Sequence, residues 1–296
     1  MQTLRAYKEL SKSGIVALVL ISVMGGYLAG QPLERKLNLT HFFLTLLGIL
    51  FLSSGSSALN QLQEVSIDAK MPRTSKRPIP SGKISHRSAA LFIFFTLGLG
   101  ILILAQISGL VLALGLSAIL FYNVLYTLWW KKKWGFAAVP GAIPGALPIW
   151  MGYSAANGQL SWGGGFFLFA LLFFWQMPHF WVIALKYKED YALGSIPTLP
   201  VSFGAGVTVR QITLWCLSYV ALALGGPLFF PVGTFYLIIA TCMGLKLLWE
   251  LKAFVKAPES KQWLQFFLWI NFSLIIYIAA AVMDLWGVYL FQDWLR

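Results

Sequence analysis

The chain is a succession of long stretches that carry no Asp, Glu, Lys or Arg. They cover residues 13–33, 37–63, 88–130, 134–185, 211–245 and 262–283. A membrane-spanning helix needs about 20 mainly apolar residues, so each of the three longest stretches predicts two helices. Their turns are expected near 108–109, 157–165 and 225–231, where Gly, Pro, Ser and Asn gather. The pattern predicts an all-α polytopic membrane protein with nine transmembrane helices in a single domain over 1–296.

The composition supports a membrane protein and excludes several other classes. Hydrophobic residues make up 58% of the 296 residues, charged residues only 11%, and the mean hydropathy is +0.74. Soluble proteins carry about 25% charged residues, so a soluble enzyme, a disordered chain and a disulfide scaffold are excluded. The two cysteines, Cys216 and Cys242, lie in apolar stretches and are expected to be core residues without a redox or metal role. The first stretch has no A-x-A-like cleavage site, so it is expected to be a helix and not a signal peptide.

The distribution of basic residues predicts the orientation. With the N-terminus in the cytoplasm, all but three of the 22 Lys and Arg residues fall on the cytoplasmic side; the exceptions are Arg35, Lys36 and Arg296. This sorting follows the positive-inside rule and places the C-terminus on the opposite face. The net charge of +12 therefore reflects topology, and no nucleic-acid partner is expected.

The first cluster of acidic residues follows the second predicted helix. Asn60, Glu64 and Asp68 are spaced four residues apart, so they share one face if that helix continues to about residue 70. Mg²⁺ prefers such oxygen ligands, commonly together with substrate phosphates. Arg73 and Arg77 follow directly and suit an anion. The pattern indicates a metal-diphosphate site, and the alternative is a solvated polar helix end.

A second cluster lies after the sixth predicted helix, on the same side of the membrane. His179, Lys186 and Asp190 are spaced seven and four residues apart, which also predicts one helical face. Glu189 precedes the last of them. For His179 the alternative is a buried histidine that hydrogen-bonds a neighbouring helix.

These motifs resemble the UbiA superfamily of intramembrane aromatic prenyltransferases over essentially the whole chain. The resemblance rests on Asn60…Asp68-Ala-Lys-Met71…Arg73-Thr74…Arg77-Pro78, on Tyr126-Thr127 followed by Lys131-Lys132, and on Pro178-His179-Phe180-Trp181…Glu189-Asp190-Tyr191…Ile196-Pro197…Leu199-Pro200. The last motif is similar to the branch that acts on heme. This chain has Glu64 where the superfamily usually carries Asp.

The resemblance implies transfer of a farnesyl group from farnesyl diphosphate to a vinyl group of protoheme IX (heme B), giving heme O and diphosphate. It implies Mg²⁺ as the cofactor and heme B as a substrate. The implied metal ligands are Asn60, Glu64, Asp68, Glu189 and Asp190. The residues implied to act on the diphosphate or beside it are Arg73, Arg77, Tyr126, Lys131 and Lys186, and those implied to contact the heme are His179 and Trp181.

The resemblance also implies a setting and leaves two alternatives. It places the protein in a bacterial inner membrane, surrounded by lipid, with heme A synthase or the terminal oxidase assembly as protein partners. A UbiA-type enzyme acting on a quinone-precursor ring is one alternative. The other is an ion-coupled transporter, although transporters more often carry ionisable groups near the bilayer midplane.

Overall fold

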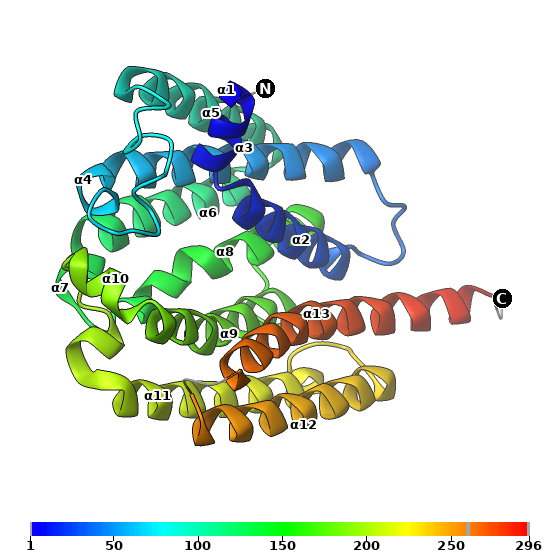
Figure 1. Cartoon of the computed structure of the whole chain (residues 1–296). Coiled ribbons are helices and arrows are strands. Elements are labelled where there is room, and N and C mark those ends of the chain that lie inside the picture. The colour runs from blue at the N-terminus through cyan, green and yellow to red at the C-terminus, as the bar shows by residue number, and fades with distance from the viewer. Residues whose placement is uncertain (1, 259–260, 295–296) are drawn as a thin grey trace.

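The computed structural model describes residues 2–258 and 261–294, and this part is helical with no β-strand. Within these ranges long helices follow one another along the chain (Figure 1). They are α2 (Ser13–Gly30), α3 (Leu39–Gln63), α5 (His86–Ile107), a rod made of α6 (Gly109–Ile119), the π-helix η1 (Leu120–Trp130) and α7 (Lys131–Lys133), α8 (Ala138–Asn157), α9 (Gly164–Lys186), α11 (Leu199–Leu224), α12 (Thr234–Lys256) and α13 (Gln262–Trp294). Four short helices complete the described part: α1 (Gln2–Leu10), α4 (Val65–Asp68), α10 (Lys188–Leu193) and η2 (Gly226–Leu228).

Seven helices in the described residues are long and apolar enough to cross a membrane. The two remaining long helices, α8 and α12, lie where the apolar pattern predicts spans but fall outside that group. Helix α8 contains Pro144 and Pro148, and α12 carries charged residues in its second half. The all-α membrane architecture is therefore confirmed, whereas nine spans is an approximate count.

The predicted turns at 108–109, 157–165 and 225–231 coincide with helix ends, but two boundaries were wrong. Helix α11 begins at Leu199, well before residue 211, because the exposed Arg210 does not end it; the helix is instead kinked at Gly204, where φ is 82°. Helix α13 continues past Met283 through Asp284. The buried Asp284 carboxylate accepts a hydrogen bond from the Gly233 backbone at the start of α12. A charged residue therefore does not mark the end of a helix when its side chain is paired with the end of another helix.

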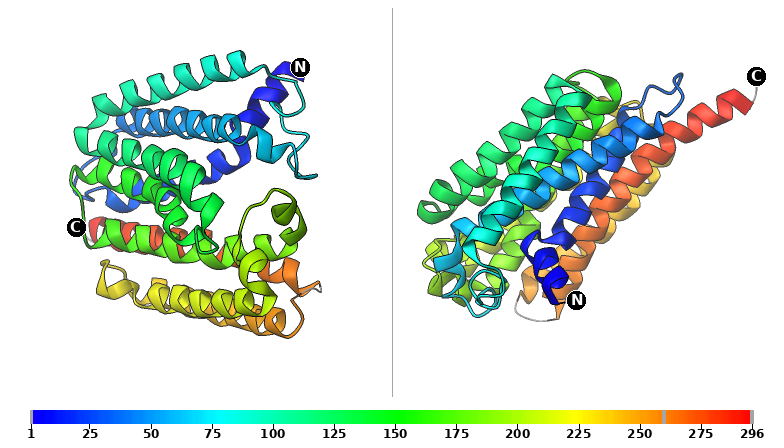
Figure 2. Two further views of the ribbon diagram at one scale, coloured as in Figure 1. Left: turned by 90° about the vertical axis from the view of Figure 1, so that its left-hand side faces the viewer. Right: turned by 90° about the horizontal axis from the view of Figure 1, so that it is seen from above.

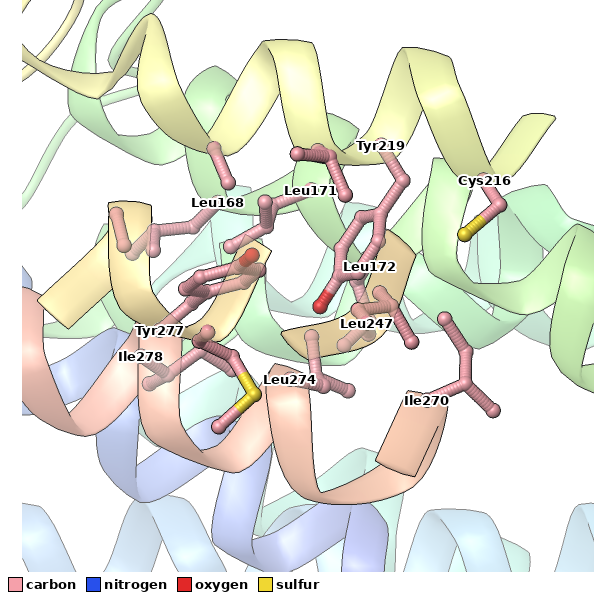
Figure 3. Close-up of a cluster of buried hydrophobic side chains, with 14 of the residues drawn as sticks. Leu168, Leu171, Leu172, Cys216, Tyr219, Leu247, Ile270, Leu274, Tyr277 and Ile278 are labelled. Atoms are coloured by element: carbon pink, nitrogen blue, oxygen red, sulfur yellow. The ribbon is translucent and has the colours of Figure 1, made fainter. Parts of the chain in front are cut away.

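The bundle is stabilised by closely packed helix pairs and by a hydrophobic core formed mainly by helices from the second half of the chain. Helix α2 packs on α8 through Gly26 and Gly30, whose missing side chains leave room for the α8 backbone at Ile149 and Tyr153. Such small-residue contacts are typical of membrane helices. Figure 3 shows part of the core, where α9, α11, α12 and α13 interdigitate. Cys216 is buried there as predicted, but Cys242 is exposed on α12, because an apolar helix face can point outward in a membrane protein.

The polar connections gather at one end of the bundle. Figure 1 shows α4, α7 and α10 together at its left-hand end, although they are far apart in the sequence. The C-terminal part of α13 extends beyond its neighbours in the opposite direction (Figure 2, right). This arrangement brings both acidic clusters to the same end of the molecule.

Candidate functional site

The first acidic cluster is buried, but it does not lie on one continuous helix. Helix α3 ends at Gln63, and Glu64 (φ −107°, ψ 12°) separates it from α4. The condition for a shared face, a helix continuing to about residue 70, is not met because the backbone turns at Glu64. Backbone hydrogen bonds between residues four apart still link the three positions. The Glu64 N–H donates to the Asn60 carbonyl at 3.1 Å, and the Asp68 N–H donates to the Glu64 carbonyl at 2.8 Å. All three side chains are 1–2% exposed.

Each carboxylate of the site has a cationic partner from another segment. Lys131 Nζ lies 2.7 Å from a Glu64 oxygen, and Arg77 Nη1 contacts both Asp68 oxygens at 2.8 and 2.7 Å. Burying unpaired carboxylates would be costly, so these pairs stabilise the acids within the bundle. The Lys131 and Arg77 side chains are held at the same place where a bound metal ion or a diphosphate would lie.

Asp190 joins the second cluster to the first. Its Oδ2 accepts a hydrogen bond from the Arg73 backbone N–H at 3.3 Å and lies 3.9 Å from Arg73 Nε. The Arg73 guanidinium lies over the rings of Tyr187 and Tyr191, at 5.0 and 5.7 Å from their centroids. Burial raises the pKa of Tyr191, so this hydroxyl stays protonated. Glu189 is exposed and points out of this buried set.

A lysine that the sequence did not single out completes the site. Lys12 lies between α1 and α2 in a left-handed conformation (φ 52°). Its Nζ donates to Asn60 Oδ1 at 2.6 Å and to the Tyr122 hydroxyl at 3.2 Å. Burial, together with the charge of Arg77, lowers the pKa of Lys12 to about 8. A lysine just before a span looks like a membrane anchor in the sequence, so no pattern distinguished it.

The wall opposite α3 is formed by the π-helix η1. Asn123 bridges the two elements: its Oδ1 accepts from Ser56 Oγ at 2.6 Å, and its Nδ2 donates to the Ser56 carbonyl at 2.9 Å. The rings of Tyr122 and Tyr126 are stacked with centroids 6.2 Å apart. π-Helices are rare and occur frequently at functional sites. The apolar pattern of this segment gave no sign of the π-helical register.

A small pocket of about 60 Å³ opens beside this wall. Tyr126 and Lys131 contribute one side of it, and Phe180 and Tyr191 contribute another. Its remaining lining comes from Trp134, Gly135, Ala137, Ala138, Ile196, Pro197 and Thr198. The predicted site residue Tyr126 thus faces a space that adjoins the buried ion pairs.

The polar cluster consists of Asn60, Glu64, Asp68 and Asp190 with their cationic partners. Besides the exposed Glu189, the predicted residues Lys186, His179 and Trp181 lie outside it. Helix α9 ends at Lys186, Tyr187 interrupts the helix, and Asp190 belongs to α10. The predicted single face for His179, Lys186 and Asp190 was wrong because this break redirects the chain. Lys186 Nζ lies over the Trp263 ring at 5.5 Å from its centroid.

His179 and Trp181 lie among aromatic side chains. The imidazole stacks between Trp175 and Phe267, at centroid distances of 4.5 and 5.3 Å. Its Nδ1 is buried without a hydrogen-bond partner. Trp181 is fully buried and packs against Phe136. Sequence spacing alone did not separate this aromatic region from the ion-paired region.

The donor atoms of the polar cluster suit a hard divalent cation. Among the described residues there is no group of three or more His, Cys, Asp or Glu side chains placed to hold a metal ion. The available ligands are instead one amide oxygen and carboxylates that already accept from Lys12, Lys131, Arg77 and Arg73. Mg²⁺ commonly takes one or two carboxylates and completes its shell with phosphate oxygens and water. The cluster fits Mg²⁺ held together with a diphosphate.

Known proteins are similar to this chain in sequence, and solved structures are similar to it in fold. Residues 19–287 match the UbiA prenyltransferase family. A protoheme IX farnesyltransferase of Bdellovibrio bacteriovorus is 45% identical over 96% of this chain and 97% of its own length. A protoheme IX farnesyltransferase of Synechococcus sp. (strain JA-3-3Ab) is 35% identical over 97% of this chain and 86% of its own length.

A solved structure of a UbiA homolog from Archaeoglobus fulgidus, bound to GPP and Mg²⁺, superposes with a TM-score of 0.69 at 18% identity. It covers 93% of this chain and 99% of its own. At that identity the likeness shows the fold. Together with the family match, it confirms the resemblance that the motifs indicated. The chain therefore belongs to the UbiA prenyltransferase family and is an integral membrane prenyltransferase.

Proposed function

We propose that the protein transfers the farnesyl group of farnesyl diphosphate to a vinyl group of protoheme IX, producing heme O and diphosphate. The observation that carries this proposal is the buried set of ion pairs around Asn60, Glu64 and Asp68 in a chain 45% identical to a protoheme IX farnesyltransferase. The polar end of the bundle binds the donor, and the aromatic region around His179 meets the acceptor.

Donor binding uses both signs of charge in the polar cluster. Asn60, Glu64, Asp68 and Asp190 would hold Mg²⁺, with Glu189 at the exposed edge. When bound, the metal ion neutralises charge on the diphosphate oxygens. Lys12, Arg73, Arg77 and Lys131 surround the leaving diphosphate, while Lys186 is a more distant contributor of positive charge.

Ionisation breaks the allylic C–O bond, and the electron pair leaves with the diphosphate. The cations of the cluster are already in place, so they stabilise the developing negative charge without reorganising at that moment. Tyr126 and the pocket beside it hold the first part of the prenyl chain. Tyr, Phe and Trp rings around that pocket exclude water and favour the allylic cation through their π-faces.

The vinyl group then attacks the allylic cation. Its terminal carbon forms the new C–C bond, and water adds at the carbon next to the porphyrin and loses a proton, which completes a hydroxyethyl-farnesyl side chain. We place His179 on the acceptor side, as an axial ligand of the heme iron or as the base for that proton. Its unpartnered Nδ1 supports either role. Trp181, which is fully buried with an unpartnered Nε1, contributes to the aromatic wall on the same acceptor side.

The setting follows from the charge distribution. We propose a bacterial inner membrane in which α4, α7, α10 and the N-terminus face the cytoplasm and the C-terminus faces the opposite side. Membrane lipid surrounds the bundle, and heme A synthase or the terminal oxidase assembly is the expected consumer of the product. Reporter fusions after residues 77 and 133 should report the cytoplasm, and a fusion at the C-terminus should report the other face. A cytoplasmic C-terminus would contradict this orientation.

The direct test is to express the chain in a bacterium without its own heme farnesylation and to analyse the extracted hemes by mass spectrometry. A heme heavier by one farnesyl group and one hydroxyl group is expected, and membranes containing the Asp68→Asn variant serve as the control. Unchanged heme together with a prenylated quinone precursor would instead establish the quinone alternative.

A further inference from the structure

The Asn60 side chain is held at both ends of its amide group. Its Oδ1 accepts from Lys12 Nζ at 2.6 Å, and its Nδ2 donates to Thr127 Oγ1 at 3.0 Å. Both Asn60 and Thr127 are buried, at 2% and 0% exposure. The amide is therefore fixed between the break that precedes α2 and the π-helix η1.

The two partners independently require the same amide orientation. A lysine ammonium can only donate hydrogen bonds, so the atom facing Lys12 must be the amide oxygen. A threonine hydroxyl has a single hydrogen, and Thr127 donates it to the Tyr122 carbonyl at 2.8 Å. Because the hydroxyl can then only accept from Asn60, the atom facing it must be the amide nitrogen.

The π-helix makes this arrangement possible. In an α-helix a threonine hydroxyl donates to the carbonyl three or four residues earlier. In η1 the accepting carbonyl of Tyr122 is five residues before Thr127, as the wider π-helical turn allows. The hydroxyl hydrogen is thus directed along η1, and its lone pair is free to face α3.

We propose that Thr127 is a positioning residue that keeps the Asn60 oxygen directed into the prenyl diphosphate site. This inference rests on the proposed function, in which Asn60 Oδ1 is a ligand of the divalent cation. If the amide rotated by half a turn, its NH₂ group would face Lys12 and the cation, and both contacts would be repulsive. Thr127 prevents this by offering only an acceptor to the nitrogen end of the amide.

The test compares Thr127→Val, which keeps the shape but removes the acceptor, with Thr127→Ser, which restores it. The probe is Mg²⁺, titrated with the purified full-length protein and farnesyl thiolodiphosphate, an unreactive analogue of the donor. The readout is the Mg²⁺ concentration that gives half of the thermal stabilisation, so no turnover is needed. Thr45→Val is the matched control, because Thr45 is also fully buried and its hydroxyl donates to the His41 carbonyl within its own helix.

Loss of a group that orients a metal ligand typically costs about 10- to 100-fold in metal affinity. Thr127→Val should raise the half-saturating Mg²⁺ concentration by about that factor, whereas Thr127→Ser and Thr45→Val should stay close to the unmodified protein. In an Asn60→Asp background, where either carboxylate oxygen can face the cation, the effect of Thr127→Val should disappear. This background tests the same idea through a second variant.

Two results would overturn the inference. One is an unchanged Mg²⁺ requirement in folded Thr127→Val, and the other is an equal loss in Thr127→Ser and Thr127→Val. If Thr127→Val does not fold, Thr127→Ala takes its place against Thr127→Ser under the same criteria. Failure of the proposed function would look different, since the unmodified protein would then show no Mg²⁺-dependent stabilisation by the farnesyl analogue.

Discussion

The polar cluster at the α4 end and the aromatic region between α9 and α13 bury polar atoms in opposite ways. In the cluster, Glu64, Asp68 and Asn60 each have a charged partner within 2.8 Å. In the aromatic region, His179 Nδ1 and Trp181 Nε1 are buried without partners. A fully paired set is rigid and prepared for charged ligands, whereas an unpaired nitrogen in an apolar wall has capacity left for a ligand. On the proposed function, the polar cluster would bind the donor and the aromatic region the acceptor.

The largest loss of turnover is expected when acidic residues of the polar cluster are replaced. Asp190→Asn and Asp68→Asn should each lower the turnover of farnesyl diphosphate by about 1,000-fold or more, because ionisation of the donor depends on the ligands and cations that they hold. Heme O formation in purified enzyme measures this. Glu189→Gln is the matched control, since Glu189 adjoins Asp190 but is exposed. An equal loss in Glu189→Gln would show that burial does not distinguish the two acids.

A somewhat smaller effect is expected for the cation that pairs with Glu64. Lys131→Met should lower turnover by about 100- to 1,000-fold, as for removal of one group that stabilises a developing anion. Glu64→Asp should retain most of the activity because it keeps the charge. The measurement is kcat and KM for farnesyl diphosphate in each variant. Turnover near the unmodified rate in Lys131→Met would remove Lys131 from the site.

In the aromatic region, His179→Ala should lower heme binding or turnover by about 10- to 100-fold, in the range of losses seen when a metal-binding side chain or its partner is removed. Binding of farnesyl diphosphate should be unchanged, because the imidazole lies outside the ion-paired cluster. Heme titration by absorbance and a separate donor-binding assay give the two readouts. Loss of both binding events would mean that the two regions are not separate.

The smallest effect is expected for Lys186. Its ammonium group lies over Trp263 and is exposed, and an exposed charge contributes about 1 kcal/mol or less. Lys186→Met should therefore change turnover by less than about tenfold, well below the effect of Lys131→Met in the same assay. A loss as large as that of Lys131→Met would place Lys186 beside the diphosphate after all.

The sequence predicted most of the helices because apolar length is a direct signal of a span. It also indicated Asn60, Asp68 and Asp190, whose charge or polarity stands out at the ends of apolar stretches. It could not indicate Lys12, which looks like any anchoring lysine, or Thr127, whose role depends on a π-helical register. The shared face of His179 and Asp190 failed because a single break at Tyr187 redirects the chain. Local breaks and cross-helix partners are three-dimensional properties that periodicity does not contain.

The pairing of every buried site carboxylate with a lysine or arginine has a thermodynamic consequence. Binding of Mg²⁺ alone would displace Lys131 and Arg77 from their acids and leave them facing another cation, and diphosphate alone would bring its negative charge toward those same acids. Bound together, each ligand takes over the partner that the other has released. On the proposed function, the affinities of Mg²⁺ and diphosphate would therefore be coupled, and by linkage each would strengthen the other by the same factor.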